Sequence, residues 1–212
     1  MPEPAVTVYS SASPSAAVVI AHGAGAGQSS PFITRVARGL VERGVSAATF
    51  DFPYMAARRK APDKPAVLEA SWRGAIAAAR AELPGVPLFI GGKSMGGRIA
   101  SQVAAGEHDA IEGLIFLGYP LHPPGRPQQR RDAHLPEIAE PMLFVQGSRD
   151  AFGTADEIRD LRPRLQRATL YEVEGGDHSF KIGGRGAPKP EAVIDSILDE
   201  VVRWMADVQV QR

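Results

Sequence analysis

The residues best suited to carry out a reaction are a serine, an aspartate and a histidine that lie far apart in the chain. Ser94 stands in Gly92-Lys93-Ser94-Met95-Gly96, a Gly-x-Ser-x-Gly pattern that follows an apolar run and precedes a helix-like stretch. A sharp turn from a buried strand into a helix lifts a serine hydroxyl clear of its neighbours in a strained backbone conformation. The helix start also supplies free backbone N–H groups beside that hydroxyl. The pattern therefore predicts a serine nucleophile.

The same stretch has a rival interpretation as a phosphate-binding loop, because Gly92-Lys93-Ser94 matches the end of Gly-x-x-x-x-Gly-Lys-Ser. That motif requires glycine where the chain has Pro87, and a flexible loop where Leu88-Phe89-Ile90 is typical of a buried strand. We therefore reject nucleotide binding, and we interpret Lys93 as a solvated neighbour of the nucleophile. Gly-x-Ser-x-Gly also occurs by chance in a chain with 22 glycines, so the interpretation depends on further residues.

Candidate partners for Ser94 follow two later apolar runs. Asp150 follows the strand expected over 141–147, and His178 follows the one expected over 168–173. In a parallel sheet, groups that follow the carboxyl ends of the strands meet at one edge. The order Ser, Asp, His is the one found in α/β-hydrolases. We expect His178 to take the Ser94 proton and return it to the leaving group, and Asp150 to orient the imidazole.

Negative charge that develops on a substrate would be stabilised by backbone N–H groups. We assign this oxyanion hole to Met95, directly after the nucleophile, and to the loop residues Gly23, Ala24 and Gly25. The chemistry would be acyl transfer through an acyl-serine, with water as the usual acceptor. Aromatic residues that flank the strand ends would line an apolar acyl pocket. They are Phe52, Tyr54, Tyr119, Phe152 and Phe180.

Each assignment has a simpler alternative. Asp150 could cap the helix that begins near residue 154, in which case Asp156 is the fallback acid. Asp177 is a competing acid, although its adjacency to His178 makes contact with that ring unfavourable. His178 could be an ordinary loop histidine, but its place after the last strand favours a catalytic role.

The remaining histidines and one basic run are interpreted as non-catalytic. His22 would serve the structure of its loop. His108, His122 and His134 would be surface or loop residues, and they lack a metal-ligand spacing such as His-Glu-x-x-His. The run Arg58-Arg59-Lys60 is typical of a solvated surface, with contact to an anionic substrate as the alternative.

Alternating strand and helix patterns surround these residues. The expected strands cover residues 16–21, 45–52, 86–91, 111–118, 141–147 and 168–173, with an edge strand over 6–10. The expected helices cover residues 31–43, 66–83, 94–105, 154–165 and 191–205. This alternation predicts an α/β fold: a mostly parallel sheet of about six to seven strands with helices on both faces. The loops over 53–65 and 119–137 could shape a pocket rim but are too short for a lid domain.

Composition sets the broad class. A length of 212 residues suits one α/β domain, which we place over 1–212, and 24 basic residues balance 24 acidic ones. Nothing therefore indicates a nucleic acid or a membrane as a partner. The absence of cysteine excludes disulfides and a thiolate nucleophile. We see neither a signal peptide nor a membrane span, so we expect a cytoplasmic monomer or homodimer without metal or cofactor.

Several longer segments resemble one protein family. They are Phe50-Asp51-Phe52-Pro53-Tyr54-Met55, Gly91-Gly92-Lys93-Ser94-Met95-Gly96-Gly97-Arg98, Gly118-Tyr119-Pro120-Leu121-His122-Pro123-Pro124-Gly125, Gln146-Gly147-Ser148-Arg149-Asp150-Ala151-Phe152-Gly153 and Gly176-Asp177-His178-Ser179-Phe180. In these motifs, and from about Val18 to Met205, the chain resembles the KANL3/Tex30 family. That family is a compact branch of the α/β-hydrolase superfamily related to dienelactone hydrolases. The resemblance implies an α/β-hydrolase fold without a lid domain, and it supports Ser94, Asp150 and His178 as a triad.

Three functions follow from these observations. The first is a serine hydrolase that acts on a small ester or thioester. The second is a non-catalytic binding or scaffold module, since the family includes subunits of chromatin complexes and the proline-rich loop 119–137 could form a docking surface. The third is a peptidase or acyltransferase with the same triad. Dienelactone hydrolases use a cysteine where this chain has Ser94, so their substrate is not carried over.

Overall fold

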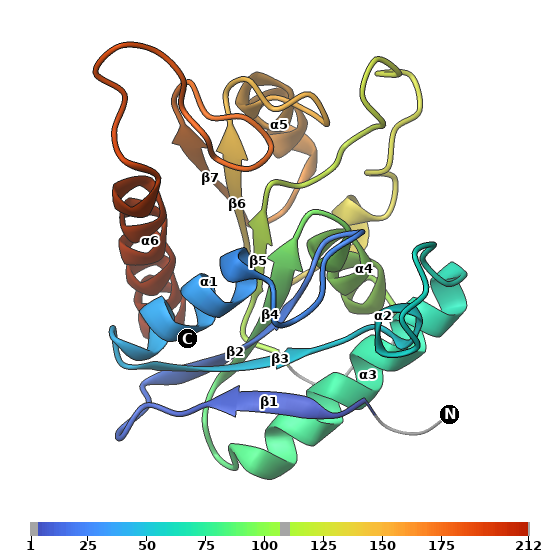
Figure 1. Cartoon of the computed structure of the whole chain (residues 1–212), viewed down its shortest axis with the longest axis vertical. Helices are drawn as coiled ribbons and strands as arrows, with labels where there is room; N and C mark the ends of the chain where they lie inside the picture. Colours follow the sequence, from blue (N-terminus) through green and yellow to red (C-terminus); the bar gives the residue numbers. More distant parts are fainter. Residues whose placement is uncertain (1–3, 107–110, 212) are drawn as a thin grey trace.

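The computed structural model describes residues 4–106 and 111–211, and its centre is a seven-stranded sheet in the order β1-β3-β2-β4-β5-β6-β7 (Figure 1). The strands are β1 Val6–Tyr9, β2 Ala16–Ala21, β3 Val45–Phe50, β4 Leu88–Lys93, β5 Leu114–Leu117, β6 Met142–Gly147 and β7 Ala168–Val173. All neighbouring strands pair in parallel except β1, which pairs antiparallel with β3 at one edge. This confirms the expected mostly parallel sheet.

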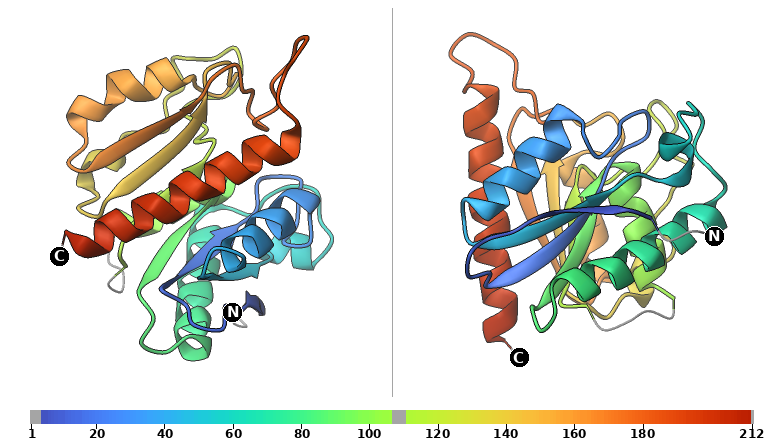
Figure 2. Two further views of the ribbon diagram at one scale, coloured as in Figure 1. Left: turned by 90° about the vertical axis from the view of Figure 1, so that its left-hand side faces the viewer. Right: turned by 60° about the horizontal axis from the view of Figure 1, so that its bottom comes forward.

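Helices cover both faces of the sheet (Figure 2). They are α1 Pro31–Val41, α2 Pro53–Ala56, α3 Pro65–Glu82, α4 Met95–Ala104, α5 Ala155–Leu161 and α6 Pro190–Val210, with short 3-10 turns at Leu135–Glu137 and Arg162–Arg164. Side chains of α1 and α6 share one apolar core with one face of the sheet, and those of α3, α4 and α5 share another core with the opposite face. Within the described residues, no segment forms a separate lid over the sheet.

The two cores follow from the two-residue period of the strands. Every residue of β2 is buried: Val19 faces the core under α3 and α4, whereas Val18 and Ile20 face the core under α1 and α6. Successive strand side chains point to opposite faces, so a strand covered on both sides reads as a continuous apolar run. Trp72 packs in the core under α3 and α4, and its indole N–H donates a hydrogen bond to the Gly96 carbonyl oxygen at 3.1 Å.

The structure differs from the expected elements mainly at their ends. The stretch 53–65, expected to be a loop, begins with the short helix α2, because Pro53 takes the first helical position after an extended Phe52. Helix α6 continues beyond Met205, because the buried Val208 extends its apolar face. Among the described residues, no helix has the length and apolar character required to cross a membrane.

Candidate active site

Ser94 lies on a strained turn between β4 and α4. Its backbone angles are φ 50° and ψ −116°, which L-residues rarely adopt, and it is the N-cap residue of α4. The helix crosses close to the loop after β2: a Cβ atom on Gly96 would lie 2.5 Å from the carbonyl oxygen of Ala21. Only glycine fits this approach, so the sequence pattern has a steric origin. The turn holds the Ser94 hydroxyl at the carboxyl end of the sheet.

The structure brings Ser94, His178 and Asp150 together. The His178 Nε2 atom lies 2.8 Å from the Ser94 Oγ atom, and its Nδ1 atom lies 2.7 Å from the Asp150 Oδ2 atom. An ionised carboxylate only accepts, so Nδ1 carries the proton and Nε2 is left to accept the hydroxyl proton of Ser94. Asp150 is 1% exposed and also accepts hydrogen bonds from the Phe152 backbone N–H at 2.8 Å and the Gln146 amide at 3.0 Å.

The alternative acids have other contacts. Asp156 lies on the exposed side of α5, where it pairs with Arg159. The Asp177 carboxylate accepts a hydrogen bond from the backbone N–H of Ser179 at 2.7 Å. Thr154, rather than Asp150, caps α5 and forms a capping box with Glu157. Asp150 is therefore the acid whose carboxylate contacts the imidazole.

A tight turn after β7 presents His178. An isolated bridge joins Gly176 to Ile182, and Phe180 between them has a φ of 61° with its side chain only 2% exposed. Phe180 thereby anchors the turn in the core under α1 and α6. The ring of Phe152 packs against the imidazole, with its centroid 4.2 Å from that of the His178 ring. The imidazole is thus held between an aromatic ring and its two polar partners.

Lys93 does not have the solvated position expected from the sequence. Its ammonium donates a hydrogen bond to the backbone carbonyl oxygen of His178 and lies 5.4 Å from the centroid of the Phe180 ring. Burial lowers the pKa of Lys93 to about 8, although the carboxylates of Asp150 and Asp177 oppose the decrease. The interpretation of Lys93 as a solvated neighbour was wrong. Its ammonium has a hydrogen-bond acceptor, the His178 carbonyl oxygen, on a loop that is distant in sequence and that the local pattern could not reveal.

The glycine-rich loop after β2 lies against Ser94. A Cβ atom on Gly23 would be 3.6 Å from the Ser94 Cβ atom, so the loop backbone touches the elbow. His22 orders this loop: its Nδ1 atom is 2.8 Å from the Gly23 carbonyl oxygen, and its Nε2 atom accepts the Phe52 backbone N–H at 3.2 Å. Burial lowers the pKa of His22, which favours the neutral ring that these two contacts require. This agrees with the structural role inferred for His22.

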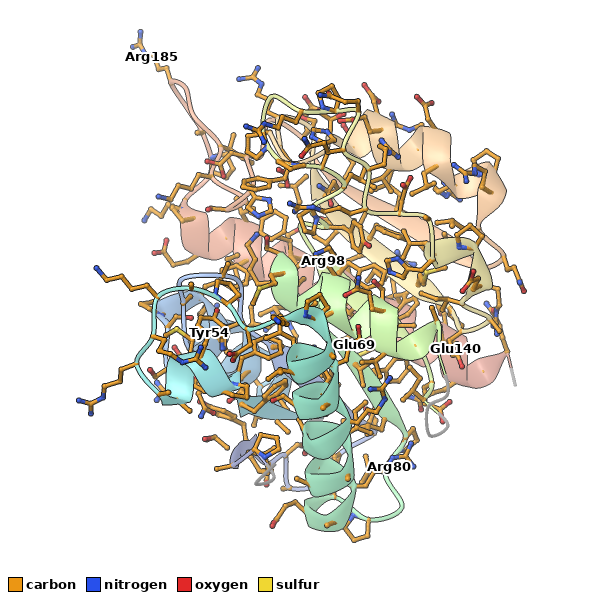
Figure 3. The ribbon with its side chains drawn as sticks, turned by 90° about the vertical axis from the view of Figure 1, so that its right-hand side faces the viewer. Tyr54, Glu69, Arg80, Arg98, Glu140 and Arg185 are labelled. Carbon is orange, nitrogen blue, oxygen red and sulfur yellow. The ribbon has the colours of Figure 1, made fainter. Side chains whose placement is uncertain are left out.

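Four of the five aromatic residues expected in an acyl pocket pack in the core. Phe52, Tyr54 and Tyr119 are 0% exposed and Phe180 is 2% exposed, so in this structure they do not line an open pocket. Tyr54, on α2 (Figure 3), and Tyr119 belong to the core under α3 and α4. Phe152 alone among the five is half-buried, and it is the one that contacts His178.

The other histidines and the basic run have ordinary partners. His122 is a loop residue as expected but is buried rather than on the surface, and it contacts Glu157 at 3.1 Å. His134 contacts the hydroxyl of Ser101 at 2.8 Å. His108 lies outside the described residues. Arg58-Arg59-Lys60 is exposed, and no three acidic or imidazole side chains in the described ranges are grouped as metal ligands.

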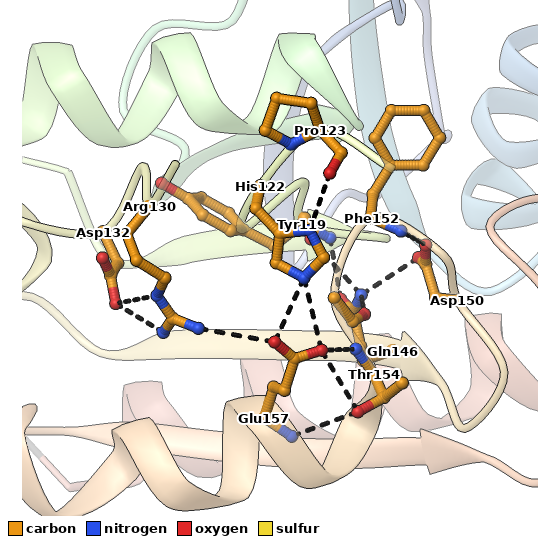
Figure 4. A network of polar contacts seen from close by, with 11 residues as sticks. Tyr119, His122, Pro123, Arg130, Asp132, Gln146, Asp150, Phe152, Thr154 and Glu157 are labelled. Carbon is orange, nitrogen blue, oxygen red and sulfur yellow. Dashed lines mark hydrogen bonds and ion pairs between the residues drawn. The ribbon is translucent and has the colours of Figure 1, made fainter. Parts of the chain in front are cut away.

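Gln146 is a site residue that sequence reasoning did not single out. Its amide nitrogen donates to the Asp150 carboxylate at 3.0 Å and to the Gly153 carbonyl oxygen at 2.6 Å, while its Oε1 atom accepts the Tyr119 backbone N–H at 2.8 Å (Figure 4). It is 0% exposed. The available signal was a polar amide at the end of an otherwise apolar strand, since buried polar groups are nearly always hydrogen-bonded.

Comparison with known proteins agrees with this fold. Residues 14–206 match the family described as "Alpha/beta hydrolase domain", so the chain belongs to this family. The class that the fold and site define is therefore that of the α/β-hydrolases.

Solved structures with the same fold include three from bacteria. An α/β serine hydrolase homologue from Coxiella burnetii has a TM-score of 0.73 at 17% identity and covers 93% of this chain and 89% of its own. A dienelactone hydrolase from Anabaena variabilis has a TM-score of 0.73 at 19% identity, covering 95% and 90%. Est1E from Butyrivibrio proteoclasticus, solved with ferulic acid bound, has a TM-score of 0.68 at 16% identity, covering 96% of both chains. At these identities the likeness is one of fold.

Proposed function

We propose that this protein is a serine hydrolase that cleaves a small ester or thioester through a Ser94-His178-Asp150 triad. The observation that supports this most directly is the unbroken chain of contacts from the Ser94 hydroxyl through the imidazole to a buried carboxylate, at 2.8 and 2.7 Å. A serine in a strained turn, a base within hydrogen-bond reach and a third group that orients the base are the parts that nucleophilic catalysis requires.

The first half-reaction forms an acyl-enzyme. The Ser94 oxygen attacks the acyl carbonyl carbon, its proton passes to His178 Nε2, and the carbonyl electron pair moves onto the oxygen. Backbone N–H groups of Met95 and of Gly23, Ala24 or Gly25 would stabilise that oxyanion. The imidazolium, stabilised by Asp150, then gives its proton to the leaving oxygen or sulfur as the bond to it breaks.

The second half-reaction regenerates the enzyme. Water gives a proton to His178 and its oxygen attacks the acyl carbonyl carbon. The imidazolium then returns this proton to the Ser94 oxygen as the bond between that oxygen and the acyl carbon breaks, which releases the acid and restores the hydroxyl. A peptidase or acyltransferase would use the same first step with another leaving group or acceptor, so only acceptor assays separate them. We favour a small ester because only Phe152 of the expected aromatic lining reaches the site, which provides little apolar surface for a long acyl chain.

Membership in the KANL3/Tex30 branch is part of this proposal and is supported by the five motifs. The branch also motivates the scaffold alternative, in which the loop 119–137 docks to a partner. An intact and connected set of three catalytic side chains favours turnover over that alternative. We likewise propose that residues 1–212 form one domain.

A fluorophosphonate probe tests the proposal directly, because it reacts with serine only where the hydroxyl is activated. We expect the folded protein to be labelled at Ser94 and to hydrolyse p-nitrophenyl acetate, with kcat/KM falling along a panel of longer acyl esters. Protein unfolded in urea is the control and should not be labelled. Absence of labelling in the folded protein, combined with capture of a stable partner, would support the scaffold alternative instead.

A further inference from the structure

Lys93 is a half-buried lysine that the proposed mechanism does not use. It is the last residue of β4, directly before the nucleophile. Its ammonium donates to the backbone carbonyl oxygen of His178, a residue 85 positions later in the chain. This contact joins the strand that carries the hydroxyl to the turn that carries the base.

The surroundings of the ammonium are built to accommodate it. The ring of Phe180, the core anchor of the same turn, lies 5.4 Å from the nitrogen, within the range of a cation–π contact. Gly118, after β5, has a φ of 72°, and a Cβ atom there would lie 2.9 Å from the Lys93 nitrogen and 3.3 Å from the His178 carbonyl oxygen. The space for the ammonium therefore depends on a glycine at position 118.

The charges around the ammonium come from the site itself. Asp150 and Asp177 both attract it, and His178 contributes the accepting carbonyl. Burying an ammonium costs free energy that an apolar side chain of the same length would not incur. Packing alone therefore does not explain a lysine at this position. The hydrogen bond to the His178 carbonyl oxygen does, since a charge-assisted hydrogen bond is stronger and more directional than an apolar contact.

We propose that Lys93 is a positioning residue that fixes the turn of His178 over Ser94. The inference rests on the proposed function, because it gives Lys93 a role in the same reaction. Lys93 does not contact the reacting atoms. It acts through the backbone of His178, which sets the height and the angle of the imidazole above the hydroxyl.

Kinetics of Lys93→Met test this proposal, with Lys181→Met as the matched control because that lysine is exposed on the same turn. We expect Lys93→Met to lower kcat for p-nitrophenyl acetate roughly ten- to hundredfold, as expected for a small displacement of a catalytic group, with KM changed less than about twofold. Fluorophosphonate labelling of Ser94 should slow by a similar factor. Lys181→Met should retain wild-type values, and wild-type kinetics in Lys93→Met would overturn the proposal.

The pH profile and a spectroscopic signature separate positioning from general stabilisation. Wild-type kcat/KM should decline above about pH 8 as the ammonium loses its proton, whereas Lys93→Met should lack this decline. The imidazole proton shared with Asp150 should give a downfield NMR signal in the wild type that broadens or moves in Lys93→Met. An unchanged signal in the variant would contradict the proposal even if the wild type hydrolyses no ester, in which case only the proposed function fails. If Lys93→Met does not fold, Lys93→Gln removes the charge while it keeps a polar side chain, and unaltered kcat there would count against the proposal.

Discussion

Among the described residues, His178 and His122 each lie within hydrogen-bond distance of a carboxylate near the carboxyl end of the sheet, and only His178 is arranged to move a proton. His178 contacts Asp150 through Nδ1, and His122 contacts Glu157 through Nε2 at 3.1 Å. Their second nitrogens differ: that of His178 lies 2.8 Å from a serine hydroxyl, whereas that of His122 lies 2.9 Å from the Pro123 carbonyl oxygen. Both nitrogens of His122 therefore face acceptors, and neither can take a proton from a hydroxyl.

The two pairs are also physically connected. The His122 backbone N–H donates to the Phe152 carbonyl oxygen at 3.1 Å, and the Phe152 N–H donates to Asp150 at 2.8 Å (Figure 4). The half-buried pair of His122 and Glu157 thus supports the segment that carries Asp150. The comparison shows that a histidine beside a carboxylate indicates catalysis only when its other nitrogen faces a reactive hydroxyl.

A second serine–histidine contact reinforces this point. The Ser101 hydroxyl lies 2.8 Å from His134 Nε2, as close as Ser94 lies to His178. However, Ser101 donates its proton to the Arg98 carbonyl oxygen at 2.7 Å, so His134 must be the donor in that contact. The direction of the hydrogen bond, rather than its length, distinguishes a nucleophile from a structural hydroxyl.

Removing each serine hydroxyl should give the largest contrast. Ser94→Ala should lower kcat on the order of a millionfold, because the nucleophile is lost. Ser101→Ala should leave kcat within about twofold, since the contacts of its hydroxyl are to Arg98, Tyr119 and His134 rather than to the proposed triad. Rates of ester hydrolysis measured on both variants check this. Equal losses in the two would mean that Ser94 is not the nucleophile.

Exchanging each carboxylate for its amide should separate catalysis from stability. Asp150→Asn should reduce kcat by about 10⁴-fold through loss of the correct imidazole tautomer. Glu157→Gln should lower the free energy of unfolding by about 1–3 kcal/mol with kcat little changed, because it removes the charge that His122 and Arg130 contact, although a glutamine still closes the capping box. Urea unfolding and steady-state kinetics measure the two quantities. A catalytic defect in Glu157→Gln as deep as that of Asp150→Asn would erase the distinction between the two pairs.

The charge of Lys93 should produce a pH-dependent stability difference. Its pKa is about 8 in the folded protein against 10.5 without burial, so the unfolded chain binds more protons between these values. The wild type should therefore gain stability relative to Lys93→Met as the pH rises from 8 to 10.5, by at most about 3 kcal/mol. Unfolding curves at pH 7 and pH 10 check the sign. Curves that shift in parallel would show that the lysine is not buried as a charge.

The smallest expected effect concerns the backbone of the elbow. Ser94 has a φ of 50°, which is unfavourable for alanine and acceptable for glycine. Ser94→Gly should consequently be more stable than Ser94→Ala by about 1 kcal/mol, although neither has a nucleophile. Thermal unfolding of the two inactive variants measures this strain separately from catalysis, and a less stable glycine variant would show that the turn is relaxed.

Sequence patterns identified most of the sheet because its strands are buried runs with clear ends. β2 and β7 have the predicted bounds, and the expected edge strand is β1. Ser94, Asp150 and His178 could be grouped because each follows a strand, and parallel strands bring their carboxyl ends together. Helix and strand ends were less accurate, since the last turn depends on packing that no local pattern records.

The direction of side chains could not be predicted in the same way. Tyr54 and Tyr119 do follow strand ends, but the turns send both rings into the core, and a sequence does not show which way a turn rotates its residues. The Lys93 contact was inaccessible for another reason. Its acceptor is a main-chain oxygen, which every residue has, so no residue type marked the partner.

The order of the strands also determines which part of the molecule limits the temperature at which activity survives. The hydroxyl stands at the middle of the sheet, but the acid and the base follow β6 and β7, the two outermost strands on one side. Rims of sheets open at lower cost than their centres. On heating, activity should therefore be lost when β6 and β7 open. This temperature should lie below the one at which the rest of the protein unfolds.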